Sequence, residues 1–269
     1  MNRNLFLLIL SQVFGFTAAT VTVFISGIIG SDLSSIKTLS TLPPSIYVVG
    51  TAAATIFAAK IMSIIGRRLG FIFASVAGSI SCLIGAYAII IESFFIFCFA
   101  KFILGATMAF THQYRFAAAE SVEKEKAPKA ISSLLLAGIV AAFLGIGLAN
   151  YTKNFVSYYL YVGSYLTLAV LTLIPSFLLF FFKNIREISF VSNKENNSRN
   201  YSEFFSDPKF LQAITSAAFA YAVMSFLMTA TPISMHIQDK MSLNSTSFVI
   251  QFHIISMFLP ALITGNLIK

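Results

Sequence analysis

Charged residues are scarce in this 269-residue chain, at 10% of the total, whereas a typical soluble domain has about 25%. Hydrophobic residues make up 57% and the mean hydropathy is +0.84. A water-soluble fold cannot bury that much apolar surface. The composition therefore predicts an integral membrane protein, in which runs of about 20 apolar residues cross the bilayer as helices.

Residues that carry chemistry are also few. Cys82 and Cys98 both lie in apolar runs, where cysteine usually serves as a small packing residue, and no zinc or haem ligand spacing is present. The sequence contains no H-E-x-x-H, no G-x-S-x-G and no paired aspartates within an apolar run. We therefore expect no catalytic residues, no metal site, no cofactor and no enzymatic activity.

The net charge of +8 does not indicate a nucleic-acid partner, because the basic residues are dispersed among loops and form no aromatic-interleaved patch. If the N-terminus is cytoplasmic, thirteen Lys and Arg residues fall on the cytoplasmic side and three on the other. This bias is typical of the positive-inside rule. It predicts a multi-pass protein of a bacterial cytoplasmic (inner) membrane with both termini in the cytoplasm.

Eight apolar runs follow one another along the chain. They span residues 5–29, 45–65, 71–91, 94–117, 131–150, 156–182, 209–234 and 246–268. The runs are continuous and do not alternate with period two, which excludes a membrane β-barrel and favours helices. We predict an all-α polytopic fold with a six-helix bundle at 1–182, a polar cytoplasmic linker at 183–208 and two helices of a second bundle at 209–269. Asp207 and Pro208 resemble an N-cap and a first-turn proline that open the seventh helix.

Between the second and third runs lies the turn Gly66, Arg67, Arg68. It resembles the G-x-x-x-D-x-x-G-R-R pattern of the major facilitator superfamily, with Ala59 in place of the first glycine and Ser63 in place of the aspartate. In that family the turn takes part in a cytoplasmic gate, so the resemblance implies a gating role here. A tight turn carrying two inside-positive anchors is the alternative.

The fourth run carries an unusual set of polar residues. Lys101, Gly105, Met108, His112 and Arg115 are spaced by four, three, four and three residues, which places them on one helix face. Lysine or arginine at mid-membrane costs about 2.5 to 3.5 kcal/mol each, so this face is expected to line a central cavity. Alternatively, the two cations snorkel to opposite interfaces.

This run also resembles the family. "KFILGATMAF" is similar to the R-x-x-x-G pattern of its fourth helix, with Lys101 replacing arginine, and "HQYRFAAAES" resembles a poorly characterised bacterial branch.

Four residues are candidates for binding or coupling. Arg115 is expected to bind an anionic group or pair with a carboxylate, and His112 to relay a proton. In the first run, Gln12 approximates one face with Thr17 and Thr20 and is expected to join Lys101 at the same cavity. Hydroxyls bonded to their own helix are the alternative for the two threonines.

The resemblance implies secondary transport of a small organic solute by alternating access. Coupling of this transport to protons is one option. Because the family has twelve helices and eight are predicted here, we expect a chain truncated after eight. It would then be transport-incompetent, or one part of a split transporter completed by a second polypeptide or by an oligomer. The expected partners are the solute and the lipid bilayer, with no nucleic acid.

Overall fold

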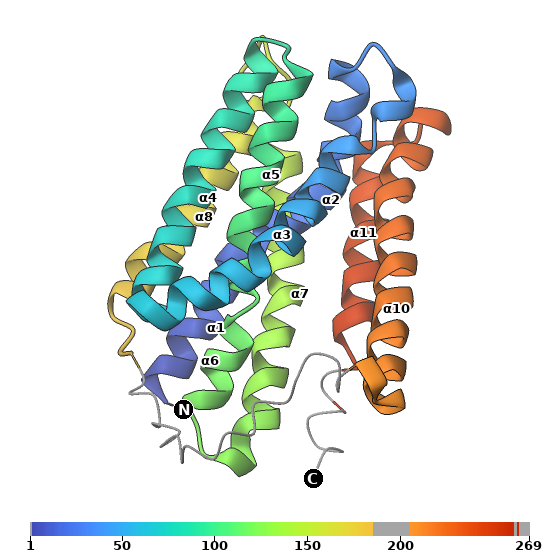
Figure 1. Cartoon of the computed structure of the whole chain (residues 1–269). Helices are drawn as coiled ribbons and strands as arrows, with labels where there is room; N and C mark the ends of the chain where they lie inside the picture. Colours follow the sequence, from blue (N-terminus) through green and yellow to red (C-terminus); the bar gives the residue numbers. More distant parts are fainter. Residues whose placement is uncertain (1, 185–204, 261–262, 264–269) are drawn as a thin grey trace.

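The computed structural model describes residues 2–184, 205–260 and 263. Most of these residues are helical and none forms a strand, which confirms the all-α class (Figure 1). Seven helical stretches in the described ranges are long and apolar enough to cross a membrane. The eighth predicted run corresponds to α11, and its last residues lie outside the described part of the chain.

The helices follow the predicted runs closely. The bounds are α1 Arg3–Gly15, α2 Thr17–Leu33, α3 Leu42–Ile65, α4 Arg67–Ile90, α5 Phe94–Thr111, α6 Tyr114–Glu120, α7 Ala127–Thr152, α8 Val162–Phe180, α10 Pro208–Ile233 and α11 Leu243–Phe258. Short 3₁₀ turns lie at Lys37–Leu39 and Lys124–Lys126, and a π-helical turn at Ser234–Gln238 follows α10. The predicted linker at 183–208 lies mostly outside the described residues, so the domain boundaries stay predictions.

The predicted start of α10 is confirmed. Asp207 is its N-cap, and the carboxylate accepts a hydrogen bond from the backbone N–H of Lys209 at 2.9 Å. Pro208 occupies the first helical position, where the missing N–H costs nothing because that group has no intrahelical partner.

Two predicted single helices are interrupted. The first run forms α1 and α2, which meet at Phe16, and the fourth forms α5 and α6, which meet at His112 and Gln113. Each pair still amounts to one membrane span. The interruption changes which way the side chains beyond it face, so the helical spacing that continues from Lys101 to Arg115 does not describe one straight face.

Helices α3 and α5 pack with their backbones almost in contact. A Cβ atom added to Gly105 would overlap the carbonyl oxygen of Tyr47, and one added to Gly50 would overlap the carbonyl oxygen of Phe102. The Thr51 hydroxyl donates a hydrogen bond to the Gly105 carbonyl at 2.9 Å. Small residues allow this approach between membrane helices, and the contact fixes the place of Tyr47.

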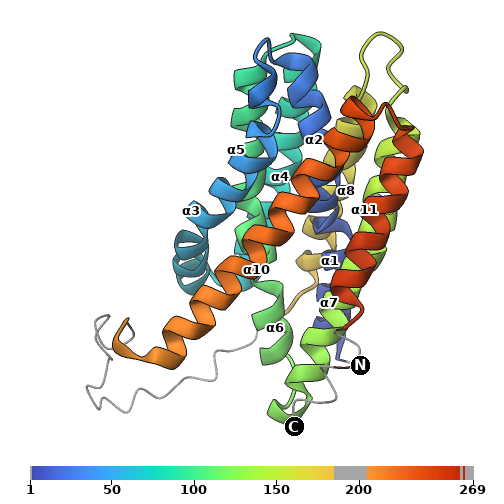
Figure 2. The same ribbon diagram turned by 90° about the vertical axis from the view of Figure 1, so that its right-hand side faces the viewer.

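The last two helices stand against the six-span part of the chain. Helix α11 runs beside α7, and α10 packs on α2 (Figures 1 and 2). The contacts are again made over glycines, since a Cβ at Gly27 would meet Ile233 of α10 and one at Gly138 would meet Phe258 of α11. The described part therefore places α10 and α11 along one side of the N-terminal helices.

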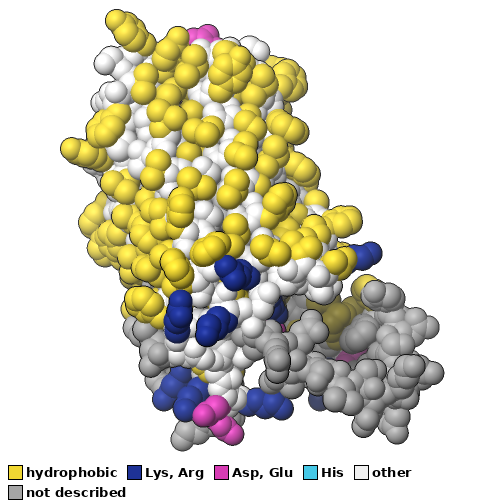
Figure 3. Space-filling view, turned by 90° about the vertical axis from the view of Figure 1, so that its left-hand side faces the viewer, with side chains coloured by type: hydrophobic (Ala, Val, Ile, Leu, Met, Phe, Trp, Pro, Cys, Tyr) yellow, Lys and Arg dark blue, Asp and Glu magenta, His cyan; other side chains and the backbone are white. Residues whose placement is uncertain are grey.

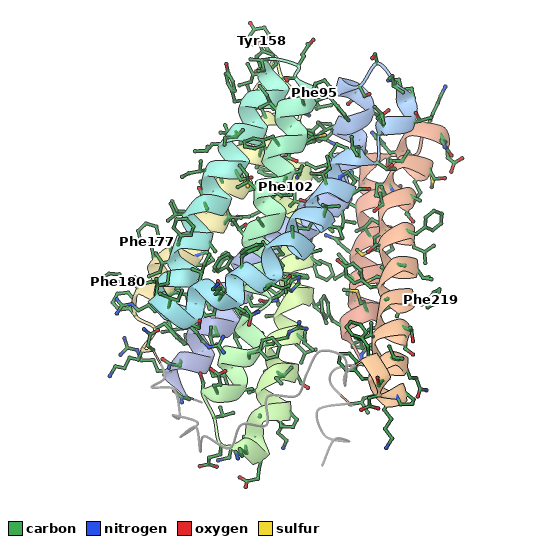
Figure 4. The ribbon with its side chains drawn as sticks, in the orientation of Figure 1. Phe95, Phe102, Tyr158, Phe177, Phe180 and Phe219 are labelled. Carbon is green, nitrogen blue, oxygen red and sulfur yellow. The ribbon has the colours of Figure 1, made fainter. Side chains whose placement is uncertain are left out.

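The outer surface is that of a membrane protein. Figure 3 shows hydrophobic side chains covering most of one face, with Lys and Arg side chains gathered toward its lower end. The aromatic rings labelled in Figure 4 project outward, and Phe95, Phe177 and Phe219 are all more than half exposed. Lipid covers such surfaces, so the exposed faces do not by themselves require a second polypeptide. The second polypeptide and the orientation in the membrane both stay predictions.

We predict that Gly105→Ala lowers the melting temperature of the detergent-purified protein by several degrees. The added methyl group must displace the α3 backbone, and overpacking of this kind costs about 1 to 3 kcal/mol. Gly147→Ala is the matched control, because a Cβ at Gly147 meets nothing within 4 Å. Equal melting temperatures for the two variants would show that the α3–α5 contact is not close.

Candidate functional site

A cavity of about 250 Å³ lies between the N-terminal helices and the pair α10 and α11. Its walls come from both parts of the chain. They are formed by Gln12, Phe16, Ala19, Thr20, Thr22, Val23, Pro44, Tyr47, Val48, Thr51, Met108, Thr111, His112, Arg115, Leu134, Leu135, Tyr221, Met224, Ser225, Met228, Thr229, Ile254, Met257 and Phe258. A solute held here touches both sets of helices.

Aromatic rings and methionines dominate the walls. Phe16, Tyr47, Tyr221 and Phe258 supply flat apolar surfaces from four different helices or helix junctions. Four methionines, at 108, 224, 228 and 257, add flexible, polarisable side chains. Such a wall suits a flat, largely apolar ring system, because rings stack on aromatic faces and methionine adapts to their edges.

Two buried polar atoms in the walls have no partner among the described residues. They are Oε1 of Gln12 and the hydroxyl of Tyr47, whose residues are 6% and 7% exposed. A buried polar group left without a hydrogen bond costs about 1 to 3 kcal/mol. The Gln12 oxygen can only accept, whereas the tyrosine hydroxyl can donate and accept. The pair is therefore suited to a solute that offers both a donor and an acceptor.

The interruption between α5 and α6 brings two further polar side chains to the cavity. His112 is the C-cap of α5, and Arg115 lies in the first turn of α6. Arg115 is exposed, and its guanidinium lies 5.1 Å from the ring of Phe116. Neither of the two ion pairs found among the described residues involves Arg115. The structure thus brings Gln12, His112 and Arg115 together in one cavity.

Lys101 has a different place from the one predicted. Its side chain is fully buried, is not among the cavity residues, and donates a hydrogen bond from Nζ to the Thr22 hydroxyl oxygen at 3.0 Å. Snorkelling is therefore wrong for this lysine. The expectation that this face lines the cavity is also wrong for Lys101 and Gly105, because this part of α5 packs inside the bundle against α2, α3 and α4.

Thr17 and Thr20 of the first span were each expected either to line the cavity or to bond to their own helix. Thr20 lines the cavity, but its hydroxyl also donates to the Thr17 carbonyl at 3.0 Å. Thr17 is not a wall residue and donates to the Phe14 carbonyl at 2.5 Å. Bonding to the local backbone therefore accounts for both hydroxyls.

Sequence reasoning missed much of the cavity wall. Tyr47, Tyr221 and the methionines lie in apolar runs, where nothing in the sequence distinguishes a cavity residue from one that faces lipid. Tyr47 is the one of these wall residues for which the sequence offers a signal, because on α3 it follows two prolines and precedes Gly50.

The turn between α3 and α4 is a well-defined structure at the end of the molecule where α8 ends. Gly66 has a φ of 82°, in the region that favours glycine. The guanidinium of Arg67 holds the Glu120 carboxylate with two hydrogen bonds, of which Nε to Oε2 measures 2.9 Å. Glu120 thus supplies a carboxylate to a turn that has Ser63 at the family's aspartate position.

Arg68 links the same turn to the end of α8. Its backbone N–H donates to Oδ1 of Asn184 at 2.9 Å, and its guanidinium lies 4.8 Å from the centre of the Phe180 ring. A Cβ at Gly66 would meet the Asn184 amide. The turn is therefore attached to both α6 and α8, which the sequence did not indicate.

We predict that Arg67→Ala and Glu120→Ala each lower the melting temperature slightly, and that the double variant lowers it no further. The pair is partly exposed, so its coupling is expected to be at most about 1 kcal/mol. Lys126 and Glu123 form a more exposed pair three residues apart, and its removal is the control with no measurable effect. Additive losses from Arg67 and Glu120 would contradict the pairing.

Comparison with known proteins identifies relatives over almost the whole chain. The family model described as Major Facilitator Superfamily matches residues 5–269. The riboflavin transporter RfnT of Brucella anthropi is 31% identical over 266 residues, which cover 99% of this chain and 67% of that protein. Two uncharacterized MFS-type transporters of Bacillus subtilis, YdeG and YddS, are 25% and 22% identical and are covered to 64%. The chain spans about two thirds of the length of these curated relatives.

Proposed function

The chain belongs to the Major Facilitator Superfamily, and on that premise we propose that it binds and moves a planar heteroaromatic solute of the flavin type. The solute occupies the cavity between the N-terminal helices and α10 and α11. The observation that carries the proposal is the pair of unpartnered polar atoms, Gln12 Oε1 and the Tyr47 hydroxyl, in a wall otherwise rich in aromatic and methionine side chains.

The chemistry of a flavin ring complements this wall. The tricyclic ring stacks on aromatic side chains, and its pyrimidine edge carries an imide N–H between two carbonyl groups. The N–H is a donor for Gln12 Oε1 and a carbonyl is an acceptor for the Tyr47 hydroxyl. The name of the Brucella anthropi relative supports the same solute class, at 31% identity.

Alternating access is the proposed mechanism of movement. The last two helices contact the first part through the Asn150 amide, which donates to Oδ1 of Asn244 at 2.5 Å, and through Gly27 against Ile233. Arg115 is an exposed residue of the cavity wall, and neither asparagine of this contact belongs to that wall. We propose that rocking of the two parts breaks the Asn150–Asn244 contact and opens the cavity between them.

We predict saturable quenching of riboflavin fluorescence by the purified chain, with weaker binding in Tyr47→Phe and Gln12→Met. Each variant removes one hydrogen bond while keeping the shape of the side chain. Losing one bond of about 1 to 1.5 kcal/mol raises the dissociation constant roughly five- to tenfold.

Tyr87→Phe is the matched control, because Tyr87 lies on α4, is 57% exposed and takes no part in the cavity. Its dissociation constant should equal that of the unaltered chain. Unaltered protein that shows no saturable quenching contradicts the flavin class. Equal affinities for the tyrosine variants at positions 47 and 87 contradict the placement of the ring edge.

We also propose that movement of the solute is coupled to protons through His112. Its imidazole is in the cavity wall, so a change in its charge alters the electrostatic interaction with a bound solute. In proteoliposomes, an imposed proton gradient should drive accumulation by the unaltered chain. His112→Asn should abolish that accumulation and retain exchange of labelled for unlabelled solute. Accumulation that persists in the variant, or exchange without any response to the gradient in the unaltered chain, would refute coupling at this residue.

A further inference from the structure

Two hydroxyl groups of α10 are polar features of the cavity that the proposed binding of the ring does not use. They belong to Ser225 and Thr229, which both line the cavity and are both half-buried. Neither hydroxyl has a hydrogen-bond partner among the described residues. Thr215 and Thr231 of the same helix differ, because the hydroxyl of each donates at 2.7 Å to the backbone carbonyl four residues earlier.

The two hydroxyls lie on one face of α10. Residues four positions apart are neighbours on a helix surface, with Cβ atoms about 5 to 6 Å apart. Tyr221, another wall residue, lies one turn before Ser225. An aromatic ring and two hydroxyls therefore follow one another along the side of α10 that faces the cavity, and Met224 and Met228 lie beside them in the wall.

A solute that fills the cavity displaces water from these hydroxyls. A polar group that loses water and gains no other partner makes binding weaker. In the proposed arrangement the polar edge of the ring lies at Gln12 and Tyr47, which belong to the N-terminal helices. A second polar part of the solute is therefore needed to serve Ser225 and Thr229.

The wall residues of α10 and α11 indicate the chemistry of this second part. Among the cavity residues that the structure describes on these two helices, none is charged, so an ionic group would meet no counter-charge there. The serine and threonine hydroxyls each donate and accept, as the hydroxyls of an alcohol do. A chain with hydroxyls on successive carbons offers a partner to each of two side chains that lie one helical turn apart.

We infer that Ser225 and Thr229 bind a neutral, polyhydroxylated side chain of the solute, such as the ribityl chain on the ring of riboflavin. The N-terminal helices then hold the edge of the ring and α10 holds the chain. One solute thus joins the two parts of the protein that alternating access moves. This assignment rests on the proposed function and adds the class of substituent that the ring carries.

Riboflavin and lumiflavin test the assignment by fluorescence quenching with the purified chain. Lumiflavin has the same ring system with a methyl group in place of the ribityl chain. The unaltered chain should bind riboflavin about tenfold more tightly, or better. Ser225→Ala and Thr229→Val each remove one hydroxyl, and each should raise the dissociation constant of riboflavin about three- to tenfold. The dissociation constant of lumiflavin should stay the same or fall, which also shows that the variant is folded.

Ser216→Ala and Thr215→Val are the matched controls. Both positions are exposed on α10 and lie outside the cavity wall, and the chemical changes are the same as in the test variants. The affinities of both flavins for these two variants should equal those of the unaltered chain.

The outcomes separate the assignment from the proposed function. If neither flavin binds the unaltered chain, the proposed function fails. If lumiflavin binds as tightly as riboflavin or more tightly, the assignment is overturned while the ring site stands. Equal losses of affinity for both flavins in the test variants overturn it as well. Should one test variant fail to fold, the other decides the question by itself.

Discussion

The close crossing of α3 and α5 holds the proposed site in place. Lipid offers no hydrophobic force that would press two helices together, so the two backbones must approach until their surfaces interlock. Gly50 and Gly105 permit that approach, and the Thr51 hydroxyl bonds across it. Tyr47 sits at the crossing, and Met108 lies one turn beyond it, so two walls of the cavity derive their geometry from one contact.

Helix interruptions give the cavity its polar end. A continuous fourth helix would carry the sequence of polar residues from Lys101 to Arg115 along one line. The wall residues of this span begin on α5 with Met108 and Thr111, before the interruption, and continue beyond it with His112 and Arg115. Lys101, earlier on α5, is buried inside the bundle and is not a wall residue, whereas Arg115 of the same membrane span lines the cavity.

The features predicted from the sequence are those that depend on composition and local signals. Hydropathy gave the helices within a few residues, and Asp207 and Pro208 gave the start of α10 because capping is a local interaction. Of the four expected site residues, Gln12, His112 and Arg115 line the cavity, while their roles in binding and coupling stay predictions. The place of Lys101 was not, because helical periodicity shows which residues share a face and cannot show which neighbour that face meets. The Arg67–Glu120 pair joins residues 53 positions apart, and no local pattern relates them.

Helix α6 has only seven residues and lies between the basic turn and the cavity. Arg67 donates hydrogen bonds to Glu120, the last residue of α6, and Arg115 is the second residue of the same helix. The Arg67–Glu120 pair therefore joins α6 to the α3–α4 turn, and Asn184 joins that turn to the end of α8. One short helix thus connects the wall of the cavity to the basic turn through named contacts at both of its ends.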